Sequence, residues 1–583
     1  MLVLSKVTYA ILVKYFMRFY TQIRYALPWL FHMWKPTLPA DLQPVFTQRF
    51  HARQHRLSSA MAQVQSRGSG LLRARRVLTM VPGLDGDSLW WQDGRIRGVG
   101  SAAAMEKAAP RQVPRLELAD TLVTPGLVDG HTHLAMWALN RRRVELPGRF
   151  TREEVIARVA AARPLQGWVV GQGWDANGWS SPPHRLALDP VQQGPVYLDS
   201  LDVHAAWLNS AALAAAGITR DTPDPFGGRI VRDANGDPTG LLLERAVELV
   251  TPYLPEPPAH ALEDAIRDAQ TEAHRLGVTG IHDVESMAVL AAFGRLDVSG
   301  ELRLRVLFHP PVRALPSLIA DGARSGEGSE WLTLGGVKMF LDGSLGSRTA
   351  WMLEPYAGTR DRGMPITGEK EVRDAMASAA AAGIASTVHA IGDAAVRRAL
   401  ELLSAVPRLS IPHRIEHFQC VHPLDLDRAP RTGIVLSMQP AHLLTDIDLV
   451  ERHWGDRGRG AYAFRSLLQR GARLVFGSDV PVASLDPRAG IHAALERKGF
   501  NGGPANGWRP EERIGFSEAV AGYTVGAAHA AGVGHRRGVL APGFDADLVA
   551  WAVDPAAERG DGEAFRQGQA VLTIVGGETV MRA

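Results

Sequence analysis

The stretch Leu127-Val128-Asp129-Gly130-His131-Thr132-His133-Leu134 decides both the fold and the chemistry expected of this chain. Alternation along a β-strand sends residues two positions apart to one face, so His131 and His133 would direct both imidazoles into one pocket. Two histidines on one strand make half of a metal site. An HxH pair alone is also typical of a structural histidine pair at a strand end, so the decision rests on later segments.

The composition is that of an ordinary globular protein. The 583 residues are 46% hydrophobic and 21% charged, which is enough for one large domain and a smaller companion. The single cysteine, Cys420, excludes an intramolecular disulfide framework and a cysteine-based zinc site, and it favours a reducing cytoplasm. Residues 71–583 hold 55 basic and 60 acidic side chains. This mildly acidic balance gives no reason to expect nucleic acid as a partner.

Residues 1–70 form a basic, apolar N-terminal extension with nine Lys/Arg and one Asp. It has no uninterrupted apolar run of the roughly 18 residues that span a bilayer, and it lacks a clean secretory signal. Two interpretations stay open. The extension is an interfacial membrane helix, or it is not part of the native protein, because Met33 and Met61 offer internal starts. Membrane contact is expected only through this segment.

From residue 71 onward, strand-like runs alternate with helical stretches such as 371–382 and 393–405. This alternation predicts an α/β fold with a (β/α)8 TIM barrel over 125–532, whose chemistry collects at the C-terminal strand ends. Residues 71–124 and 533–583 predict a small composite β-sandwich made from both chain ends. Eight runs of the chain predict the barrel strands: 127–133, 278–283, 303–308, 335–341, 385–389, 413–417, 434–439 and 473–478.

About 145 residues separate the first two predicted strands, far more than a helical crossover requires. We therefore assign 140–270 as an inserted subdomain that caps the site. Its Trp174 and Trp207, with Trp179 and His204 nearby, offer walls for an apolar substrate group. The alternative is that the tryptophans form the core of the insert itself.

Five predicted strand ends carry groups that bind or serve a metal. Four imidazoles and one carboxylate suit a divalent cation of borderline softness such as zinc, which lowers the pKa of water to roughly 7 and polarises carbonyls. Hydrolysis is the expected use, with Asp479 as general base and then acid. The candidate groups are His131, His133, Lys338, His389, His417 and Asp479.

Lys338 needs a separate explanation, because an ammonium beside a dication is repelled and has no lone pair. A deprotonated amine would capture CO₂ as a carbamate and so become an N6-carboxylated lysine that bridges two metals. The alternative is a lysine that pairs with Asp342 or contacts substrate.

The chain resembles the amidohydrolase superfamily, in particular its YtcJ-like branch of N-substituted formamide deformylase-type enzymes. The resemblance covers nearly everything after residue 70. Ten segments carry it: 124–134 (TPGLVDGHTHL), 167–179, 203–213, 227–242, 337–356 (VKMFLDGSLGSRTAWMLEPY), 388–396 (VHAIGDAAV), 413–419 (HRIEHFQ), 438–446, 476–487 (FGSDVPVASLDP) and 540–551.

The resemblance implies a hydrolase of carbon–nitrogen bonds other than peptide bonds, with two divalent metals, expected to be zinc. His131, His133 and Asp479 would bind the more buried metal and His389 and His417 the second, with carboxylated Lys338 as the bridge. It also weakly implies a homodimer. The sequence shows no departure at these six positions.

Three further residues are expected to contact substrate, namely Arg348, Gln439 and His442, with Asp446 as a supporting residue for the last two. A guanidinium offers a directional fork for a carbonyl or carboxylate, although a surface ion pair explains Arg348 equally well. Glu416 should point away from its neighbour His417 and is interpreted as barrel packing or as support for a ligand.

The leading hypothesis is an amidase or deformylase that releases an amine from a small-molecule amide. A hydrolytic deaminase of the same fold is the nearest rival, and ammonia release from an aminated ring would favour it. A third hypothesis is a catalytically inactive, membrane-associated binding protein docked by residues 1–70. The intact set of metal-binding groups argues against that third reading.

Overall fold

The protein is described from a computed structural model that covers residues 68–148, 150–499 and 504–583. The predictions made for the N-terminal extension fall, except for its last three residues, outside this range. Within the described residues, no helix is long and apolar enough to cross a membrane.

All eight runs predicted for the barrel are strands. Their neighbours in each sheet run parallel, and nearly every residue in them is buried. Such strands are apolar on both faces because helices cover both sides of a parallel sheet. The eight are β5 (Leu127–Thr132), β12 (Val278–Val284), β13 (Arg305–His309), β15 (Val337–Phe340), β16 (Ser386–Ala390), β17 (Arg414–His417), β18 (Val435–Met438) and β19 (Leu474–Phe476).

These strands are divided between two sheets, so the prediction of one barrel sheet is met in part. One sheet has the order β14-β13-β12-β5, in which β14 (Leu332–Leu334) was not predicted, and the other runs from β15 to β19 in sequence order. Isolated parallel bridges join the sheet edges, one between Thr132 and Val480 and one between Pro311 and Lys338. Regular pairing therefore stops at two seams, and both seams carry predicted metal-binding residues. The fold is a mixed α/β fold.

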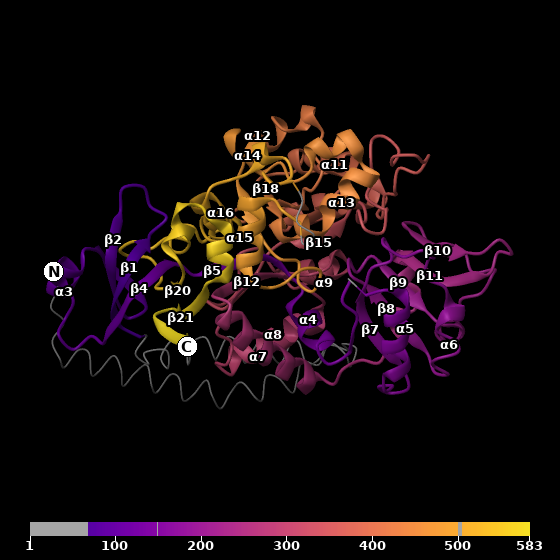
Figure 1. Ribbon diagram of the computed structural model, residues 1–583, viewed down its shortest axis with the longest axis horizontal. Coiled ribbons are helices and arrows are strands. Elements are labelled where there is room, and N and C mark those ends of the chain that lie inside the picture. Colours follow the sequence, from indigo (N-terminus) through magenta and orange to yellow (C-terminus); the bar gives the residue numbers. More distant parts are fainter. Residues whose placement is uncertain (1–67, 149, 500–503) are drawn as a thin grey trace, which may run out of the picture. The chain divides into compact units, whose positions relative to one another are not determined.

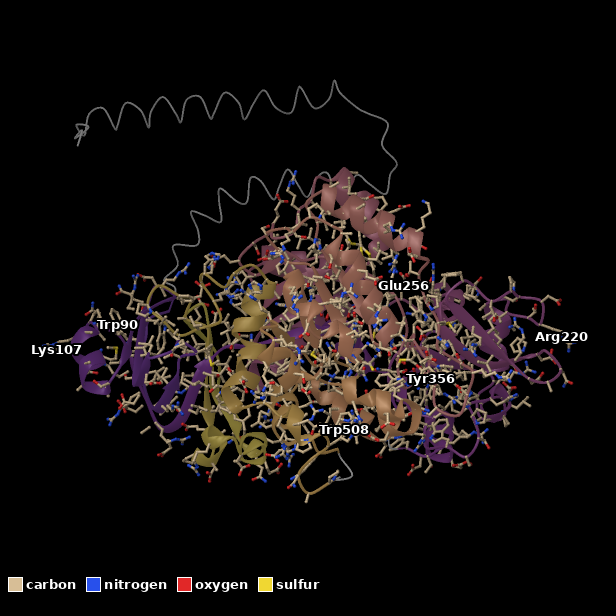
Figure 2. All side chains as sticks on the ribbon, turned by 90° about the horizontal axis from the view of Figure 1, so that it is seen from above. Trp90, Lys107, Arg220, Glu256, Tyr356 and Trp508 are labelled. Carbon is tan, nitrogen blue, oxygen red and sulfur yellow. The ribbon has the colours of Figure 1, made fainter. Side chains whose placement is uncertain are left out.

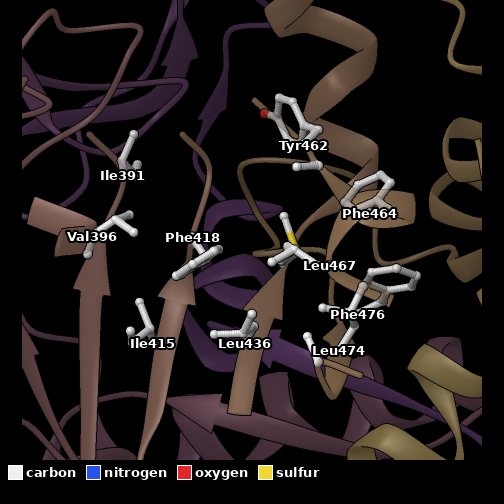
Figure 3. Packing of buried hydrophobic residues seen from close by; sticks show 14 of the residues in the cluster. Ile391, Val396, Ile415, Phe418, Leu436, Tyr462, Phe464, Leu467, Leu474 and Phe476 are labelled. Carbon is white, nitrogen blue, oxygen red and sulfur yellow. The ribbon is translucent and has the colours of Figure 1, made fainter. Parts of the chain in front are cut away.

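Helices follow most of these strands and pack their apolar faces on them (Figure 1). Figure 3 shows part of the resulting core, which contains Ile415 and Leu436 of two neighbouring strands and Phe464 and Leu467 of a covering helix. The main covering helices are α4 (Leu134–Asn140), α7 (Ala259–Arg275), α8 (Met287–Val298), α9 (Leu315–Ala320), α10 (Glu369–Ala381), α11 (Asp393–Ser404), α12 (Arg428–Thr432), α13 (Leu443–His453), α14 (Phe464–Gln469), α15 (Pro487–Glu496), α16 (Phe516–Tyr523) and α17 (Val525–Ala530).

Between β5 and β12 the chain builds a separate six-stranded sheet with the order β10-β11-β9-β8-β7-β6, which we call the insert. Side chains alternate across it: Ile230 and Leu242 pack on one face, and Trp174 and Trp207 on the other. Its elements are β6 (Val144–Glu145), α5 (Arg152–Ala161), β7 (Val169–Trp174), β8 (Val196–Ser200), β9 (Ala205–Leu208), α6 (Ser210–Ala215), β10 (Gly228–Arg232) and β11 (Pro238–Glu244).

Both ends of the described chain meet in one seven-stranded sheet with the order β22-β21-β20-β4-β1-β2-β3. The central contact is the antiparallel pairing of β4 with β20, where Ala550 faces Val123. The elements are β1 (Gly70–Leu78), β2 (Asp85–Gln92), β3 (Arg95–Gly100), α3 (Ala102–Ala108), β4 (Arg115–Pro125), β20 (Leu548–Ala552), α18 (Gly562–Gln567), β21 (Gln569–Val575) and β22 (Glu578–Arg582).

Candidate metal centre

Five of the six predicted metal-binding residues lie at or just after the C-terminal ends of parallel strands, and Lys338 lies inside its strand. His131 is on β5, Lys338 on β15, His389 on β16 and His417 at the end of β17. His133 follows β5 and Asp479 follows β19 directly across the seam, where the Asp479 amide donates to the His131 carbonyl at 2.7 Å. All but His133 are buried, and His133 is half-buried. The parallel topology thus brings together residues that lie up to 348 positions apart.

Asp479 is the centre of the cluster. Its Oδ1 lies 3.4 Å from His131 Nε2 and 3.2 Å from His133 Nε2, and its Oδ2 lies 4.0 Å from His417 Nδ1. Ligand atoms of His131, His417 and Asp479 all lie within 4.8 Å of one another. The buried nitrogens His131 Nε2 and His417 Nδ1 have no hydrogen-bond partner among the described residues. Unpartnered buried lone pairs around a carboxylate fit a bound cation.

His389 and Lys338 are the remaining two members of the cluster. The ring centroids of His389 and His417 are 4.3 Å apart. His389 Nε2 hydrogen-bonds the Gly343 carbonyl at 3.1 Å, which leaves Nδ1 as its donor to a metal. Lys338 Nζ lies 4.7 Å from the centroid of Phe340, and its charge acts on all four metal-site histidines.

Burial and like charge keep three of these imidazoles neutral. Burial and then Lys338 lower the pKa of His131 to about 4. Burial and neighbouring histidines hold the pKa values of His389 and His417 well below the usual range. Burial alone would raise the pKa of Asp479, but His131 and His133 hold it below its usual range. Neutral imidazoles beside a carboxylate are the protonation states that a divalent cation requires.

Burial lowers the pKa of Lys338 to about 8, against the opposing effects of Glu416 and Asp479. About a tenth of this amine is therefore uncharged at pH 7, and the uncharged form is the one that reacts with CO₂. The alternative partner for Lys338 has other contacts: Asp342 accepts the backbone amides of Trp351, Ile391 and Gly392.

The sequence left open whether Glu416 serves in barrel packing or supports a metal ligand, and its contacts indicate the second role. It hydrogen-bonds His131 Nδ1 and forms a buried ion pair with Arg414, two residues earlier on β17. Arg414 also donates to the Gly130 carbonyl at 2.6 Å. This arrangement fixes the His131 tautomer so that Nε2 faces Asp479. In the sequence, the spacing of two residues places Arg414 and Glu416 on the same face of one strand, which hints at an ion pair. The contact of Glu416 with His131 could not be read from the sequence, because 285 positions separate the two residues.

A cavity of about 650 Å³ opens above the cluster, between the insert and the loops that follow the barrel strands. Its walls include Trp174, Arg348 and His442, three of the residues expected to contact substrate, together with His417 and Asp479 of the cluster. In Figure 2, Tyr356, another lining residue, lies where these loops meet the insert. The cavity is therefore continuous with the candidate metal centre.

The structure places two predicted substrate contacts elsewhere. Trp207 is fully buried in the core of the insert, edge-on to Trp174, and does not line the cavity, so the alternative reading holds for it. Gln439 is 2% exposed and also lies outside the lining. Asp446, predicted to support Gln439 and His442, has other hydrogen-bond partners: it accepts Gln419 Nε2 at 2.7 Å and the Tyr462 hydroxyl at 2.6 Å.

His204 of the insert lies beside the cluster, with its ring centroid 5.2 Å from that of His389. Its Nδ1 is 2.8 Å from Glu244 Oε2. Burial opposes a charge on His204, but Glu244 outweighs it and raises the pKa to about 9. No motif in the sequence pointed to Glu244.

Comparison with known proteins agrees with this geometry. The model of the Amidohydrolase family matches residues 116–581. The chain is 34% identical to Protein LONG AFTER FAR-RED 3 of Arabidopsis thaliana (79% of this chain, 83% of that protein) and 31% identical to putative amidohydrolase YtcJ of Bacillus subtilis (81% and 92%). It is 29% identical to N-substituted formamide deformylase of Arthrobacter pascens (83% and 93%).

Among solved structures, an uncharacterized metal-dependent hydrolase from Pyrococcus horikoshii superposes with a TM-score of 0.69 at 26% identity, covering 84% of this chain and 98% of that one. The predicted resemblance to the YtcJ-like branch is confirmed. The chain belongs to the amidohydrolase family and is a hydrolase that acts on carbon–nitrogen bonds other than peptide bonds.

Proposed function

We propose that this protein is a metal-dependent amidase that hydrolyses the amide bond of a small molecule and releases an amine. One observation carries the proposal: the unpartnered nitrogens of His131 and His417 converge with Asp479 at the floor of a large cavity. One relative of the chain is an N-substituted formamide deformylase, and this similarity supports an amide as the substrate. The eight strands, joined at both seams, would form the (β/α)8 barrel that carries the site.

Two divalent cations, which we take to be zinc, fit the available groups. His131, His133 and Asp479 would hold one, and His389 and His417 the other, with Lys338 as a carbamate between them. Cations held there would polarise the amide carbonyl and lower the pKa of a nearby water. Mostly neutral imidazoles and the depressed pKa of Lys338 support this assignment.

In the proposed reaction, Asp479 accepts a proton from the water that attacks the amide carbon. The new bond joins the water oxygen to that carbon, and the carbon–nitrogen bond then breaks. Asp479 returns the proton to the leaving nitrogen, so that water and amide become a carboxylic acid and an amine. The buried His442, whose Nε2 lies 3.8 Å from Asp479 Oδ2, would orient this carboxylate.

The test is a screen of N-formyl, N-acyl and cyclic amides with protein whose zinc content has been measured. We expect amine release that disappears on chelation and returns with zinc. Ammonia release from aminated rings with no amide cleavage would instead identify the deaminase. No hydrolysis of either class by zinc-loaded protein would refute the proposal.

A further inference from the structure

The insert brings its own polar group to the reaction site. Val203 and Glu244 both have positive φ, 53° and 54°, and these two turns place His204 and Glu244 side by side at the edge of the insert. The Glu244 backbone amide donates to the His204 carbonyl at 2.9 Å, and their side chains meet at 2.8 Å. The pair is thus held at both its backbone and its side chains.

The barrel in turn holds Glu244. The Thr349 hydroxyl, in the loop after β15, donates to Glu244 Oε1. Gly343 in the same loop leaves the space that this carboxylate fills, since a Cβ there would lie 2.0 Å from Glu244 Oε1. The Gly343 carbonyl accepts from His389. One glycine therefore contacts both the insert carboxylate and a metal-site histidine, which fixes the position of the pair relative to the cluster.

His204 retains one uncommitted ring nitrogen. Nδ1 is engaged with Glu244, whereas no hydrogen bond of Nε2 is found within residues 68–148, 150–499 and 504–583. His204 lines the cavity together with His417 and Asp479. The ring of His204 neighbours that of His389. Asp479 makes its closest contacts with His131 and His133, on the opposite side of the cluster.

We propose that His204, which no motif singled out as catalytic, donates a hydrogen bond from Nε2 to the carbonyl oxygen of the amide, a role that rests on the function proposed above. When water adds to the amide carbon, its proton goes to Asp479 and an electron pair moves onto that oxygen. His204 lies on the side away from the base Asp479, so its N–H would stabilise the negative charge that develops on the carbonyl oxygen. The Glu244 carboxylate beside Nδ1 balances an imidazolium that carries hydrogen on both nitrogens.

The decisive variant is His204→Phe, which keeps a ring of similar size and removes the donor. We expect kcat on the best amide to fall about 10²-fold, as when one oxyanion donor is lost, while KM stays within a few-fold. His204→Gln retains an N–H and should recover part of the loss. His260→Phe, at an exposed histidine on α7, should behave as wild type.

Zinc content by plasma mass spectrometry and the circular dichroism melting curve should be unchanged in both His204 variants. Acetohydroxamate, an uncleaved amide analogue, supplies a readout without turnover, and its dissociation constant for zinc-loaded protein should rise about tenfold in His204→Phe. Wild-type kcat and hydroxamate affinity in His204→Phe would overturn the proposal, as would a loss of activity that only follows lost zinc. An inactive wild type would refute the amidase function, and hydroxamate binding would still decide the role of His204.

Discussion

At the scale of single residues, the candidate centre separates metal binding from proton transfer. His131 offers an unpartnered nitrogen, whereas Asp479 contacts four histidines and is also placed to move a proton. Variants at the two positions should therefore fail in different ways.

His131→Ala should lose zinc and activity together. Asp479→Asn should retain part of its zinc through the remaining imidazoles but lose 10²-fold to 10⁴-fold in kcat, because a carboxamide does not accept the proton. Zinc content and turnover measured on the same samples check this. Near-normal turnover in Asp479→Asn would remove that residue from proton transfer.

Glu416→Gln tests whether the buried pair with Arg414 positions His131. The neutral amide no longer fixes the His131 tautomer, so we expect zinc affinity to fall 10-fold to 100-fold, measured by competition with a chelator. Glu512→Gln is the matched control, because Glu512 is a buried glutamate that accepts the Ser466 amide at 2.9 Å and is not among the cavity-lining residues. Equal losses in the two variants would indicate general destabilisation.

The depressed pKa of Lys338 makes a prediction for zinc-free and CO₂-free protein. Between the folded value of about 8 and the reference of 10.5, the unfolded chain keeps a proton that the folded chain has released. The free energy of unfolding should therefore rise with pH between about 8 and 10.5. At pH values below this window, the buried ammonium lowers the free energy of unfolding by its full cost of about 3 kcal/mol.

Lys338→Met removes that cost. The variant should exceed wild type in free energy of unfolding at pH 7, and its advantage should shrink between pH 8 and pH 10.5, as urea titrations would show. Lys370→Met, at a lysine whose side chain is 89% exposed, should show no such trend. An advantage that grows with pH would contradict the assigned direction of the shift.

At the scale of elements, the sequence predicted the eight strands that carry the site, because an apolar run ending in His, Lys or Asp shows both burial and chemistry. It missed β14, which has only three half-buried residues and so no clear pattern. The sequence also left open whether Trp207 lines the substrate cavity or packs in the core of the insert, because the alternation of side chains on β9 does not tell which face of the insert is covered. The partners of Glu416 and His204 lie 285 and 40 residues away, and only the fold brings them together.

The seam between β5 and β19 depends on Gly130. A Cβ at this position would lie 2.3 Å from Val475 Cγ1 and 2.8 Å from the Phe476 carbonyl oxygen. Gly130→Ala should therefore separate the two strands, lower the free energy of unfolding by about 1–3 kcal/mol and weaken zinc binding through His131 and Asp479.

Calorimetric melting and zinc titration measure both effects of Gly130→Ala. In contrast, Gly294→Ala on α8, where a Cβ meets nothing within 4 Å, should raise stability slightly, because alanine is the better helix former. If Gly130→Ala melted no lower than wild type, the close approach at the seam would not be a constraint.

At the scale of the whole molecule, bound zinc should stabilise the described fold, because the cluster exists only when distant strands are assembled. Zinc at about 100 times its dissociation constant adds roughly 2.7 kcal/mol. Stripping the metal should lower the melting temperature of wild type and leave that of His131→Ala unchanged. Equal melting of stripped and loaded wild type would mean that the metal contributes nothing to the fold.

The pairing of β4 with β20 bears on how the chain is made. Strand β4 ends at Pro125, yet the segment that covers one of its hydrogen-bonding edges begins at Leu548. During synthesis this edge stays open while more than 400 further residues leave the ribosome, and open edges invite pairing with other chains. We therefore expect newborn copies of this protein to be most prone to misassembly through this edge before the final strands emerge.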